Sequence, residues 1–518
     1  MIVSDIVLRQ AVQCPDKVAL VWDGQPMTFA ELKSRVLRFA NALSALGIAK
    51  GDRVALLSTN RREHVEVVFA LSVVGAVWVP LNYRLTAREI EVQVSNVECS
   101  AFIYGDDMAD KAEELRDRDT SIRQWIGIGA KAAIGHRYED LMAKSSDSLP
   151  QIRVEPDDLI TIMHTGGTTG LPKGVMTTHR QLVLGALYWS YGSGARSDDK
   201  MLQVLPMMAS GGNIMQLAQL MVGSTIHIAP RFDPEQVLRL IESERITYLP
   251  VVPSMIIFLL ESPELTKHDL SSLKRIEYGS SPIPVDRLMR AGEVFDVDFQ
   301  QTYGQTETSV LTNYLDGDDH RKGFSGEAPH LLESCGRCLL GYSGQVVDDD
   351  GNPVQRGEIG EYILRGESMM SGYWNLREVS ERTLRGGWLH TGDAAKMDEE
   401  GYVYIVDRKV DKIISGGENV YPVEVENILS AHPGVLEAAV IGIPDERWVE
   451  AVKAIVVARP GLDLKAQDII GFCRDKLAGF KIPKSVDFMD ALPRTAYGKV
   501  RRSLLREPYW KSRERKIG

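Results

Sequence analysis

The sequence has few cysteines and no excess of basic residues. Its 518 residues include five cysteines, an odd and scattered set that does not predict a disulfide framework. Lysine and arginine number 60 against 71 aspartates and glutamates, which gives a formal net charge of −11. A basic surface for nucleic acid is therefore not expected, although a local basic patch is compatible with this balance. With 44% hydrophobic and 25% charged residues, the composition is that of a soluble globular protein.

The N-terminal residues also do not match the pattern of a secretory signal peptide. The first residues, MIVSDIVLRQAVQ, lack a basic start followed by an apolar core and a small-residue cleavage site. The apolar stretch 67–81 is too short for a membrane span and contains Gly75 and Pro80. We therefore expect a cytoplasmic protein.

The uncharged stretch 201–230 needs a separate interpretation. It is broken by Pro206 and two glycines, and it carries Asn213, Gln216 and Gln219 at a spacing of three residues. That spacing is typical of one side of a helix. The stretch therefore predicts a buried strand, a glycine turn and a buried helix, and no membrane span is expected.

Strand and helix patterns alternate through the first 300 residues. Residues 27–46 predict an amphipathic helix that is entered at Thr28 and has Glu31 three residues later, as in a capping box. Residues 52–57 predict a short strand and 62–74 a helix. Such alternation predicts an α/β fold with mainly parallel sheets and helices on both faces.

The residue pattern, and with it the predicted secondary structure, changes twice after this region. From residue 336, glycine, aspartate and short alternating runs predict β-hairpins, and hence a small antiparallel or barrel-like subdomain. Near Val410 a third pattern begins, which predicts a compact α+β domain of roughly a hundred residues. We therefore predict an N-terminal domain of residues 1–409, with a β-rich subdomain at 336–409, and a small mobile C-terminal domain of residues 410–518.

The segment 164–175, HTGGTTGLPKGV, carries the strongest chemical signal. Glycines let backbone N–H groups turn inward around an anion, threonines add hydroxyl donors, and Lys173 adds a positive charge. A Walker A loop needs Gly-Lys-Ser/Thr, which is absent here. The competing interpretation is a flexible surface turn. The residues predicted to bind phosphate are Thr165, Gly166, Gly167, Thr168, Thr169, Gly170 and Lys173.

This segment resembles the phosphate-binding signature of the adenylate-forming superfamily. That superfamily includes acyl-CoA synthetases, the adenylation domains of peptide synthetases and firefly-type luciferases. Gly166 stands where the usual signature has serine, so one hydroxyl donor is lost while the backbone donors remain. The resemblance extends over nearly the whole chain, with the motifs in the family's order.

Four further segments resemble the family's nucleotide-binding motifs. The segment 303–307, YGQTE, resembles Tyr-Gly-x-Thr-Glu, which implies that Tyr303 packs on adenine and that Thr306 contacts the α-phosphate. By the same resemblance Glu307, with Thr165, helps to hold Mg²⁺. The segments 279–282 (GSSP), 387–393 (GWLHTGD) and 407–408 (DR) complete the set, and Asp393 would accept hydrogen bonds from the ribose hydroxyls. The implied AMP-binding residues are Gly279, Ser280, Ser281, Pro282, Gln301, Thr302, Tyr303, Gly304, Asp393, Ile405 and Arg408.

Two further segments resemble motifs of the family's C-terminal domain. The segment 415–419, SGGEN, implies that Ser415, Gly416, Gly417 and Glu418 bind coenzyme A. The segment 492–499, LPRTAYGK, resembles the family's terminal loop and implies that Lys499 is the catalytic lysine, together with Thr306 and Glu307. The family's hinge would fall at Val410, where the usual residue is Asp or Lys.

The resemblance implies a carboxylic acid:CoA ligase that uses ATP, Mg²⁺ and coenzyme A and proceeds through an acyl-adenylate. The implied acyl pocket comprises Met207, Met208, Ala209, Ser210, Gly211 and Tyr278. Ala209 stands where the family often has histidine, which predicts an enlarged apolar pocket. Neither acyl-pocket segment supplies an arginine for a second carboxylate, so we expect a medium-chain fatty or aromatic monocarboxylic acid.

Other functions remain open at this point. The chain could load an acyl group onto a carrier-protein thiol, act as a luciferase-like oxygenase, or serve as a nucleotide-binding sensor. Cys335 and Cys338 form a CxxC that could be a redox pair or half of a zinc site, but no second pair accompanies it, so we expect incidental cysteines. The expected partners are small molecules, and a homodimer is compatible with the sequence.

Overall fold

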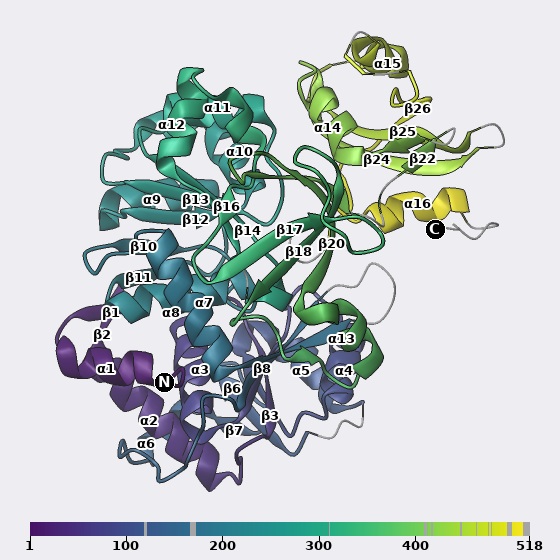
Figure 1. Ribbon diagram of the computed structural model, residues 1–518. Helices are drawn as coiled ribbons and strands as arrows, with labels where there is room; N and C mark the ends of the chain where they lie inside the picture. Colours follow the sequence, from purple (N-terminus) through teal and green to yellow (C-terminus); the bar gives the residue numbers. More distant parts are fainter. Residues whose placement is uncertain are drawn as a thin grey trace.

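The computed structural model describes residues 1–118, 122–165, 172–309, 311–408, 411, 413–415, 418–445, 448–462, 464–474, 476–477, 479–494 and 500–510. These residues form four sheets with helices packed around them (Figure 1). The large nine-stranded sheet has the order β16 (Arg337–Cys338), β15 (Asn313–Leu315), β14 (Asp298–Tyr303), β13 (Arg275–Gly279), β12 (Tyr248–Val251), β10 (Lys200–Gln203), β11 (Thr225–Ile228), β1 (Val18–Trp22) and β2 (Gln25–Thr28).

The second large sheet has eight strands. Its order is β19 (Gly372–Tyr373), β9 (Lys173–Thr178), β8 (Leu159–Thr165), β4 (Val77–Pro80), β3 (Arg53–Leu57), β5 (Ala101–Gly105), β6 (Gln124–Ile128) and β7 (His136–Arg137). In both sheets the central strands are parallel and antiparallel pairs lie toward the edges. The predicted α/β class with mainly parallel sheets is confirmed.

Helices cover both faces of each large sheet. Between the two sheets lie α1 (Asp5–Gln13), α2 (Phe29–Ala45), α3 (Arg62–Val74), α6 (Tyr138–Ala143), α7 (His179–Gly192) and α8 (Ser210–Val222), which share one hydrophobic cluster with strands of both sheets. On the far face of the nine-stranded sheet pack α9 (Pro234–Glu244), α10 (Pro253–Glu261), α11 (Val285–Val294) and α12 (Gly317–Ser325). On the far face of the eight-stranded sheet pack α4 (Ala87–Asn96) and α5 (Ala109–Arg116).

Local signals explain several of these elements. The predicted capping box is present, because Glu31 N–H donates to the Thr28 hydroxyl at 3.2 Å and Thr28 N–H donates to the Glu31 carboxylate at 2.7 Å. The uncharged stretch 201–230 forms the end of β10, the helix α8 and the strand β11, as predicted. Among the described residues no helix is long and apolar enough to cross a membrane.

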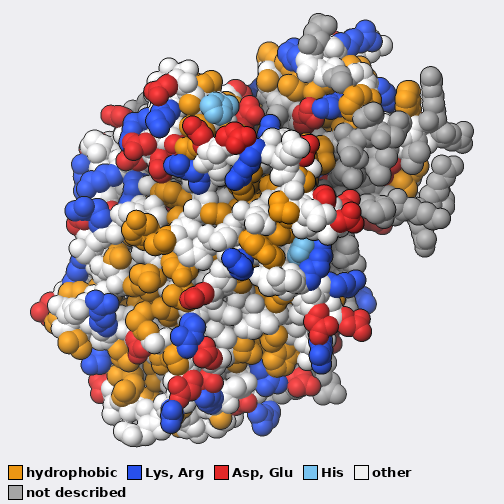
Figure 2. All heavy atoms as spheres, in the orientation of Figure 1, with side chains coloured by type: hydrophobic (Ala, Val, Ile, Leu, Met, Phe, Trp, Pro, Cys, Tyr) orange, Lys and Arg blue, Asp and Glu red, His pale blue; other side chains and the backbone are white. Residues whose placement is uncertain are grey.

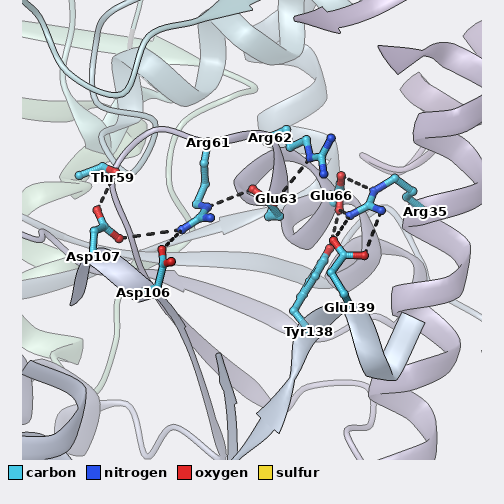
Figure 3. A network of polar contacts seen from close by, with 10 residues as sticks. All are labelled: Arg35, Thr59, Arg61, Arg62, Glu63, Glu66, Asp106, Asp107, Tyr138 and Glu139. Atoms are coloured by element: carbon cyan, nitrogen blue, oxygen red, sulfur yellow. Dashed lines mark hydrogen bonds and ion pairs between the residues drawn. The ribbon is translucent and has the colours of Figure 1, made fainter. Parts of the chain in front are cut away.

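A polar network ties the middle helices together (Figure 3). The Arg35 guanidinium on α2 donates to Glu66 on α3 and to Glu139 on α6, each at 2.7 Å. The Tyr138 hydroxyl donates to Glu66 at 2.7 Å. Glu66 is fully buried, and a buried carboxylate needs such partners. The network therefore joins the three helices α2, α3 and α6 between the two large sheets.

Two smaller sheets follow in the chain. The first is an antiparallel sheet, as the β-rich sequence pattern predicts. Its strands are β17 (Tyr342–Val347), β18 (Gly360–Gly366), β20 (Leu389–Met397) and β21 (Val403–Arg408), and α13 (Arg377–Thr383) lies within the same stretch of chain. The C-terminal sheet comprises β22 (Ile413–Ser415), β23 (Glu418–Val420), β24 (Val435–Asp445), β25 (Val449–Ala458) and β26 (Ser485–Phe488), with α14 (Pro422–Ser430), α15 (Ala466–Cys473) and α16 (Arg502–Trp510). Figure 1 shows this C-terminal part at the upper right, beside the larger N-terminal body. The boundary at Val410 lies outside the described residues and stays a prediction.

Charged side chains of both signs lie on the visible face of the described residues (Figure 2). On the face shown in Figure 2, acidic and basic side chains are interspersed among apolar ones. One ion pair crosses from the C-terminal part to the nine-stranded sheet's helices, where Arg459 lies 3.5 Å from Glu261 at the end of α10.

Candidate active site

The candidate site begins where β13 and β14 end. These strands are parallel neighbours, so their carboxyl ends meet at one edge of the sheet, where α/β proteins place ligands. A Cβ added at Gly279 would come within 2.5 Å of the Thr302 carbonyl and hydroxyl oxygens, so glycine permits this close approach. Ser280 follows with φ of 72°, a left-handed conformation that is rare for serine and common at functional turns. Ser280, Ser281 and Pro282 are exposed.

The two nucleotide motifs meet at Asp393. Its carboxylate accepts hydrogen bonds from the Tyr303 hydroxyl at 2.5 Å and from the Gln305 amide at 2.9 Å. The Gln305 amide also donates to the Thr391 carbonyl at 3.0 Å. Asp393 lies on β20 and is buried. The edge of the nine-stranded sheet is thereby joined to the antiparallel sheet, and Tyr303 lies against Asp393; their roles toward a nucleotide stay predictions.

The Thr306 side chain contacts the first residue of helix α8. The Ser210 and Thr306 hydroxyl oxygens are 3.2 Å apart, and Ser210 is the first residue of α8. The start of a helix presents free N–H groups that favour an anion. The structure therefore brings a predicted acyl-pocket residue into contact with a predicted catalytic residue.

Glu307 has a tyrosine partner. The Tyr373 hydroxyl donates to Glu307 Oε1 at 2.9 Å, and the Lys173 ammonium lies 4.9 Å from the centre of the Tyr373 ring. Glu307, Tyr373 and Lys173 thus form one chain of contacts from the short 3-10 helix after β14, Thr306–Thr308, to β9. A carboxylate oxygen and a hydroxyl such as that of Thr165 are hard oxygen donors of the kind that Mg²⁺ prefers, so these residues fit the ion.

The phosphate loop is described only at its two ends. Thr165 ends β8 and Lys173 begins β9, and the two residues face each other in the antiparallel pair. Gly166, Gly167, Thr168, Thr169 and Gly170 lie outside the described residues. Burial lowers the pKa of the neighbouring His164 to about 4, so this imidazole is neutral at pH 7. The predicted phosphate-binding role of the loop stays a prediction.

Several predicted residues of the C-terminal half can be placed only in part. Arg408 pairs with Asp393 in the ladder of β20 and β21, and Ile405 pairs with Ala395. Ser415 is fully buried and pairs with Glu418. Gly416, Gly417, Val410 and Lys499 lie outside the described residues. Arg494 forms a bridge with Val500, on either side of the segment that contains Lys499, and Arg494 lies 2.6 Å from Glu437.

The predicted acyl-pocket residues separate into two groups. Ser210 contacts Thr306, and the preceding Met207 and Met208 are buried, with Met207 N–H donating to Asn60 at 2.8 Å. Ala209 and Gly211 are partly buried beside them. Tyr278 is fully buried, and its hydroxyl lies 2.9 Å from His320 Nε2. Its neighbour Glu277 bonds to α7 instead, so the Tyr278 side chain lies on the sheet face opposite α7.

Cys335 and Cys338 are both free thiols. Cys335 is buried, and the Cys338 sulfur lies 3.1 Å from the Tyr362 hydroxyl. Burial raises the pKa of both thiols, which disfavours the reactive thiolate. Within the described part of the chain no three His, Cys, Asp or Glu side chains gather to hold a metal.

Two site residues, Gln305 and Tyr373, were not predicted from the sequence. Gln305 occupies the variable position of its motif, and Tyr373 lies 66 residues from Glu307 on a two-residue strand. No local pattern marks either residue, because each is defined by a partner that only the fold brings near.

The fold and this site define a nucleotide-binding enzyme that activates its substrate through AMP. The family model "AMP-binding enzyme" matches residues 7–374, and "AMP-binding enzyme C-terminal domain" matches residues 424–499. The chain belongs to this family of adenylate-forming enzymes.

Individual relatives match along nearly the whole chain. A feruloyl-CoA synthase from Amycolatopsis sp is 35% identical, over 97% of this chain and 98% of its own. A fatty acid–[acyl-carrier-protein] ligase, ScoC, from Streptomyces coeruleorubidus is also 35% identical, over 97% and 95%. The crystal structure of the anthranilate CoA ligase AuaEII in complex with anthranoyl-AMP has a TM-score of 0.92 at 28% identity, covering 99% of this chain and 98% of that chain.

Proposed function

We propose that this protein is an AMP-forming carboxylic acid:CoA ligase that acts on a monocarboxylic acid, aromatic or of medium chain length. The observation that carries the proposal is the meeting of three separate segments. Tyr303 and Gln305 contact Asp393, and the adjoining Thr306 contacts Ser210 at the start of α8. Adenine, ribose, α-phosphate and acyl group are the parts of an acyl-adenylate, and these segments would bind them side by side.

The reaction has two steps with MgATP and coenzyme A as substrates. A carboxylate oxygen attacks the α-phosphorus, the bond to the bridging β-phosphate oxygen breaks, and pyrophosphate leaves. The coenzyme A sulfur then attacks the acyl carbon, the bond to AMP breaks, and the thiol proton passes to solvent. Lys173 would neutralise charge on the phosphates, Thr306 would donate a hydrogen bond to the α-phosphate, and Lys499 would bridge the carboxylate and the α-phosphate.

The second step needs room for the thiol. We propose that the C-terminal domain, residues 410–518, turns about the region of Val410 and carries Lys499 away from the acyl-adenylate. Ser415, Gly416, Gly417 and Glu418 would then border the path of the pantetheine arm. Arg408 and Ile405, on β21 opposite Asp393, would remain with the nucleotide.

The substrate class is supported by the composition of the site and by the relatives. The segment 206–212 contains no arginine or lysine that could bind a second carboxylate. Feruloyl and anthranoyl groups, which the names of two relatives print, are aromatic monocarboxylic acyl groups. The missing basic residue favours a monocarboxylic acid over a dicarboxylic one, and the two names are compatible with an aromatic acid.

A pyrophosphate-release screen over carboxylic acids, with and without coenzyme A, tests the proposal. We expect release with at least one aromatic or medium-chain acid and formation of the matching thioester only when coenzyme A is present. Turnover of dicarboxylic acids alone would refute the substrate class, and no release with any acid would refute the ligase.

Lys499→Ala tests the mechanism. We expect adenylate formation to collapse while ATP still binds, because the lysine bridges two anions rather than holding the nucleotide. Lys476→Ala, a lysine beside the Phe472 ring, is the matched control and should keep full activity. Equal activity of both variants would show that Lys499 is not the catalytic lysine.

A second acceptor is a candidate because ScoC, a carrier-protein ligase, is as similar as the feruloyl-CoA synthase. Supplying coenzyme A and a phosphopantetheinylated carrier protein in parallel separates the two acceptors. Faster acyl transfer to the carrier protein would overturn the choice of coenzyme A and leave the adenylation step intact.

A further inference from the structure

Helix α8 carries buried amide side chains that the apolar interpretation of the acyl pocket does not explain. Asn213, Gln216 and Gln219 follow one another at intervals of three residues, and all three are 0% exposed. Neither amide atom of Asn213 or of Gln216 has a hydrogen-bond partner among the described residues. Gln219 differs, because its oxygen accepts from the Ser224 hydroxyl at 2.6 Å. The Gln219 nitrogen has no partner among the described residues either, so unpaired amide atoms occur on three successive turns of α8, and only Asn213 and Gln216 have both amide atoms unpaired.

Unpaired buried amides are unusual in folded proteins. Burying an amide without a hydrogen bond is unfavourable, and nearly all such groups in native structures are bonded to protein, water or ligand. Two adjacent turns with four unpaired amide atoms therefore indicate a site for a polar molecule. A purely apolar lining would be formed by leucine, methionine or phenylalanine at these positions.

The position of these amides relative to the reaction centre follows from the helix itself. Ser210 begins α8, and its hydroxyl lies 3.2 Å from that of Thr306. At a rise of about 1.5 Å per residue, Asn213 lies about 4.5 Å and Gln216 about 9 Å further along the axis. A carboxylate at Thr306 would thus direct the tail of its acid along the part of α8 that carries the two amides.

A third amide lies against the same end of α8. Gln203 ends β10 and is 0% exposed; its nitrogen donates to the Leu205 carbonyl at 2.7 Å, and its oxygen has no partner among the described residues. A Cβ at Gly212 would lie 3.2 Å from the Gln203 nitrogen, so this amide touches the first turn of α8.

The sheet register places Gln203 near the site. Met201 pairs with Tyr248 and Tyr248 with Arg275, so Gln203 is level with Glu277, two residues before Gly279. The strands β10, β12 and β13 are parallel and end at the same edge. Gln203 and Asn213 therefore lie on the side of the sheet edge that holds the adenylate motifs.

We propose that the acid activated by this protein carries a hydrogen-bonding substituent on its tail, a hydroxyl, ether, carbonyl or amine, which Asn213 and Gln216 bind. The proposal rests on the ligase function proposed above and narrows its substrate class. It adds a polar part to the pocket that the sequence predicts to be apolar. Asn213 and Gln216 are then specificity-determining residues for the acid.

Matched pairs of acids test this inference. Cinnamate is compared with 4-hydroxycinnamate, benzoate with 2-aminobenzoate, and hexanoate with 6-hydroxyhexanoate, each by kcat/KM from pyrophosphate release. We expect the wild-type enzyme to prefer the substituted member of at least one pair by about tenfold or more, because a site built to bond a polar group rejects the analogue that lacks it.

The variants Asn213→Leu and Gln216→Met replace each amide by an apolar side chain of similar volume. We expect at least one of them to lower the preference ratio about tenfold, with a thermal unfolding midpoint no lower than that of the wild type. Gln93→Met, at a buried glutamine on α4, which packs on the far face of the eight-stranded sheet, is the matched control and should leave the ratio unchanged.

Two results would overturn the inference. One is a wild-type enzyme that turns over the unsubstituted member of every pair at least as well as the substituted one, a result that needs no variant. The other is a preference ratio that survives both substitutions. The failure of the ligase proposal itself is distinct, because it would appear as no pyrophosphate release with either member of any pair.

Discussion

The Tyr303 hydroxyl lies 2.5 Å from the Asp393 carboxylate, although 90 residues separate the two in the sequence. The contact joins the end of β14 to β20, and hence the nine-stranded sheet to the antiparallel sheet. Asp393 has Gln305 as a second donor at 2.9 Å. A carboxylate that accepts two side-chain donors has a fixed orientation, so the group that would bind the ribose hydroxyls is positioned by the groups that would surround the base.

Asp393→Asn should weaken ATP binding. Hydrogen bonds to a charged group contribute about 1.5–3 kcal/mol, which corresponds to roughly a ten- to hundredfold rise in the KM for ATP. Pyrophosphate release as a function of ATP concentration measures this effect. Asp350→Asn, at an exposed turn of the antiparallel sheet, is the control and should leave the KM unchanged. An unchanged KM in Asp393→Asn would show that the carboxylate does not contact the nucleotide.

Tyr373→Phe should weaken the use of Mg²⁺ without removing the ligand. The phenylalanine keeps the ring beside Lys173 but loses the 2.9 Å bond that orients Glu307. Loss of one such bond costs about 0.5–1.5 kcal/mol, so the half-saturating Mg²⁺ concentration should rise roughly two- to tenfold.

The control for that experiment is Tyr404→Phe. It removes a bond of similar length, 3.0 Å, to Asp398 in the antiparallel sheet. Titration of pyrophosphate release with Mg²⁺ should separate the two variants. If both shift the half-saturating concentration equally, Tyr373 acts on general stability and not on the orientation of Glu307.

The sequence predicted the fold class and the motifs because both leave local patterns. The capping box at Thr28, the strand of residues 52–57 and the helix of residues 62–74 are each specified within a short window. The adenylate motifs are likewise contiguous, and it is their resemblance to the family's motifs that implies one nucleotide for Tyr303 and Asp393. Local windows cannot show that Gln305 bonds to Asp393, because that depends on strand packing between distant segments.

The acyl pocket is where prediction from the sequence was least complete. The methionines at 207 and 208 indicated an apolar site, and they are buried as such residues usually are. The amides at 213 and 216 were placed on a buried helix, but a sequence does not show whether a buried amide has a partner. Side chains alternate along β13, so either Tyr278 or Glu277 faces α7. The sequence does not show which one does, because that depends on how the strand is placed in the sheet.

The buried Glu277 carboxyl should make the free energy of unfolding depend on pH. It is fully buried, where its two oxygens accept from Trp189 at 3.0 Å and Tyr248 at 2.9 Å. Burial raises the pKa of Glu277 from 4.5 to about 7. A folded pKa above the unfolded one means that the folded state holds the proton more tightly. Glu277 therefore contributes stability that is full below about pH 4.5 and is lost as the pH rises through 7.

Comparison with Glu277→Gln tests this effect. The amide does not titrate, so the stability difference between variant and wild type should move in favour of the variant between pH 5 and pH 8, by up to ~3 kcal/mol. Urea unfolding followed by tryptophan fluorescence at several pH values measures it. Parallel pH curves for the two proteins would mean that Glu277 is ionised in the folded state throughout this range.

The two carboxylates that share Arg35 should differ greatly in what they contribute to stability. Glu66 and Glu139 each lie 2.7 Å from the guanidinium, but their side chains are 0% and 57% exposed (Figure 3). Removing Glu66 leaves the buried Tyr138 hydroxyl unpaired and the half-buried Arg35 cation with only its exposed partner Glu139, at a cost of about 3–5 kcal/mol. Removing Glu139 breaks a solvent-screened pair worth under ~1 kcal/mol.

Glu66→Ala and Glu139→Ala therefore form a pair in which the distance to Arg35 is equal, whereas Glu66 alone is buried and bonded to Tyr138. Urea unfolding should show a large loss of stability for the first variant and almost none for the second. Neither should change the KM for ATP, because both residues lie among the middle helices and not at the carboxyl ends of β13 and β14. Equal losses of stability would show that the ionic contact itself, and not the desolvation of its partners, determines the contribution of this network to stability.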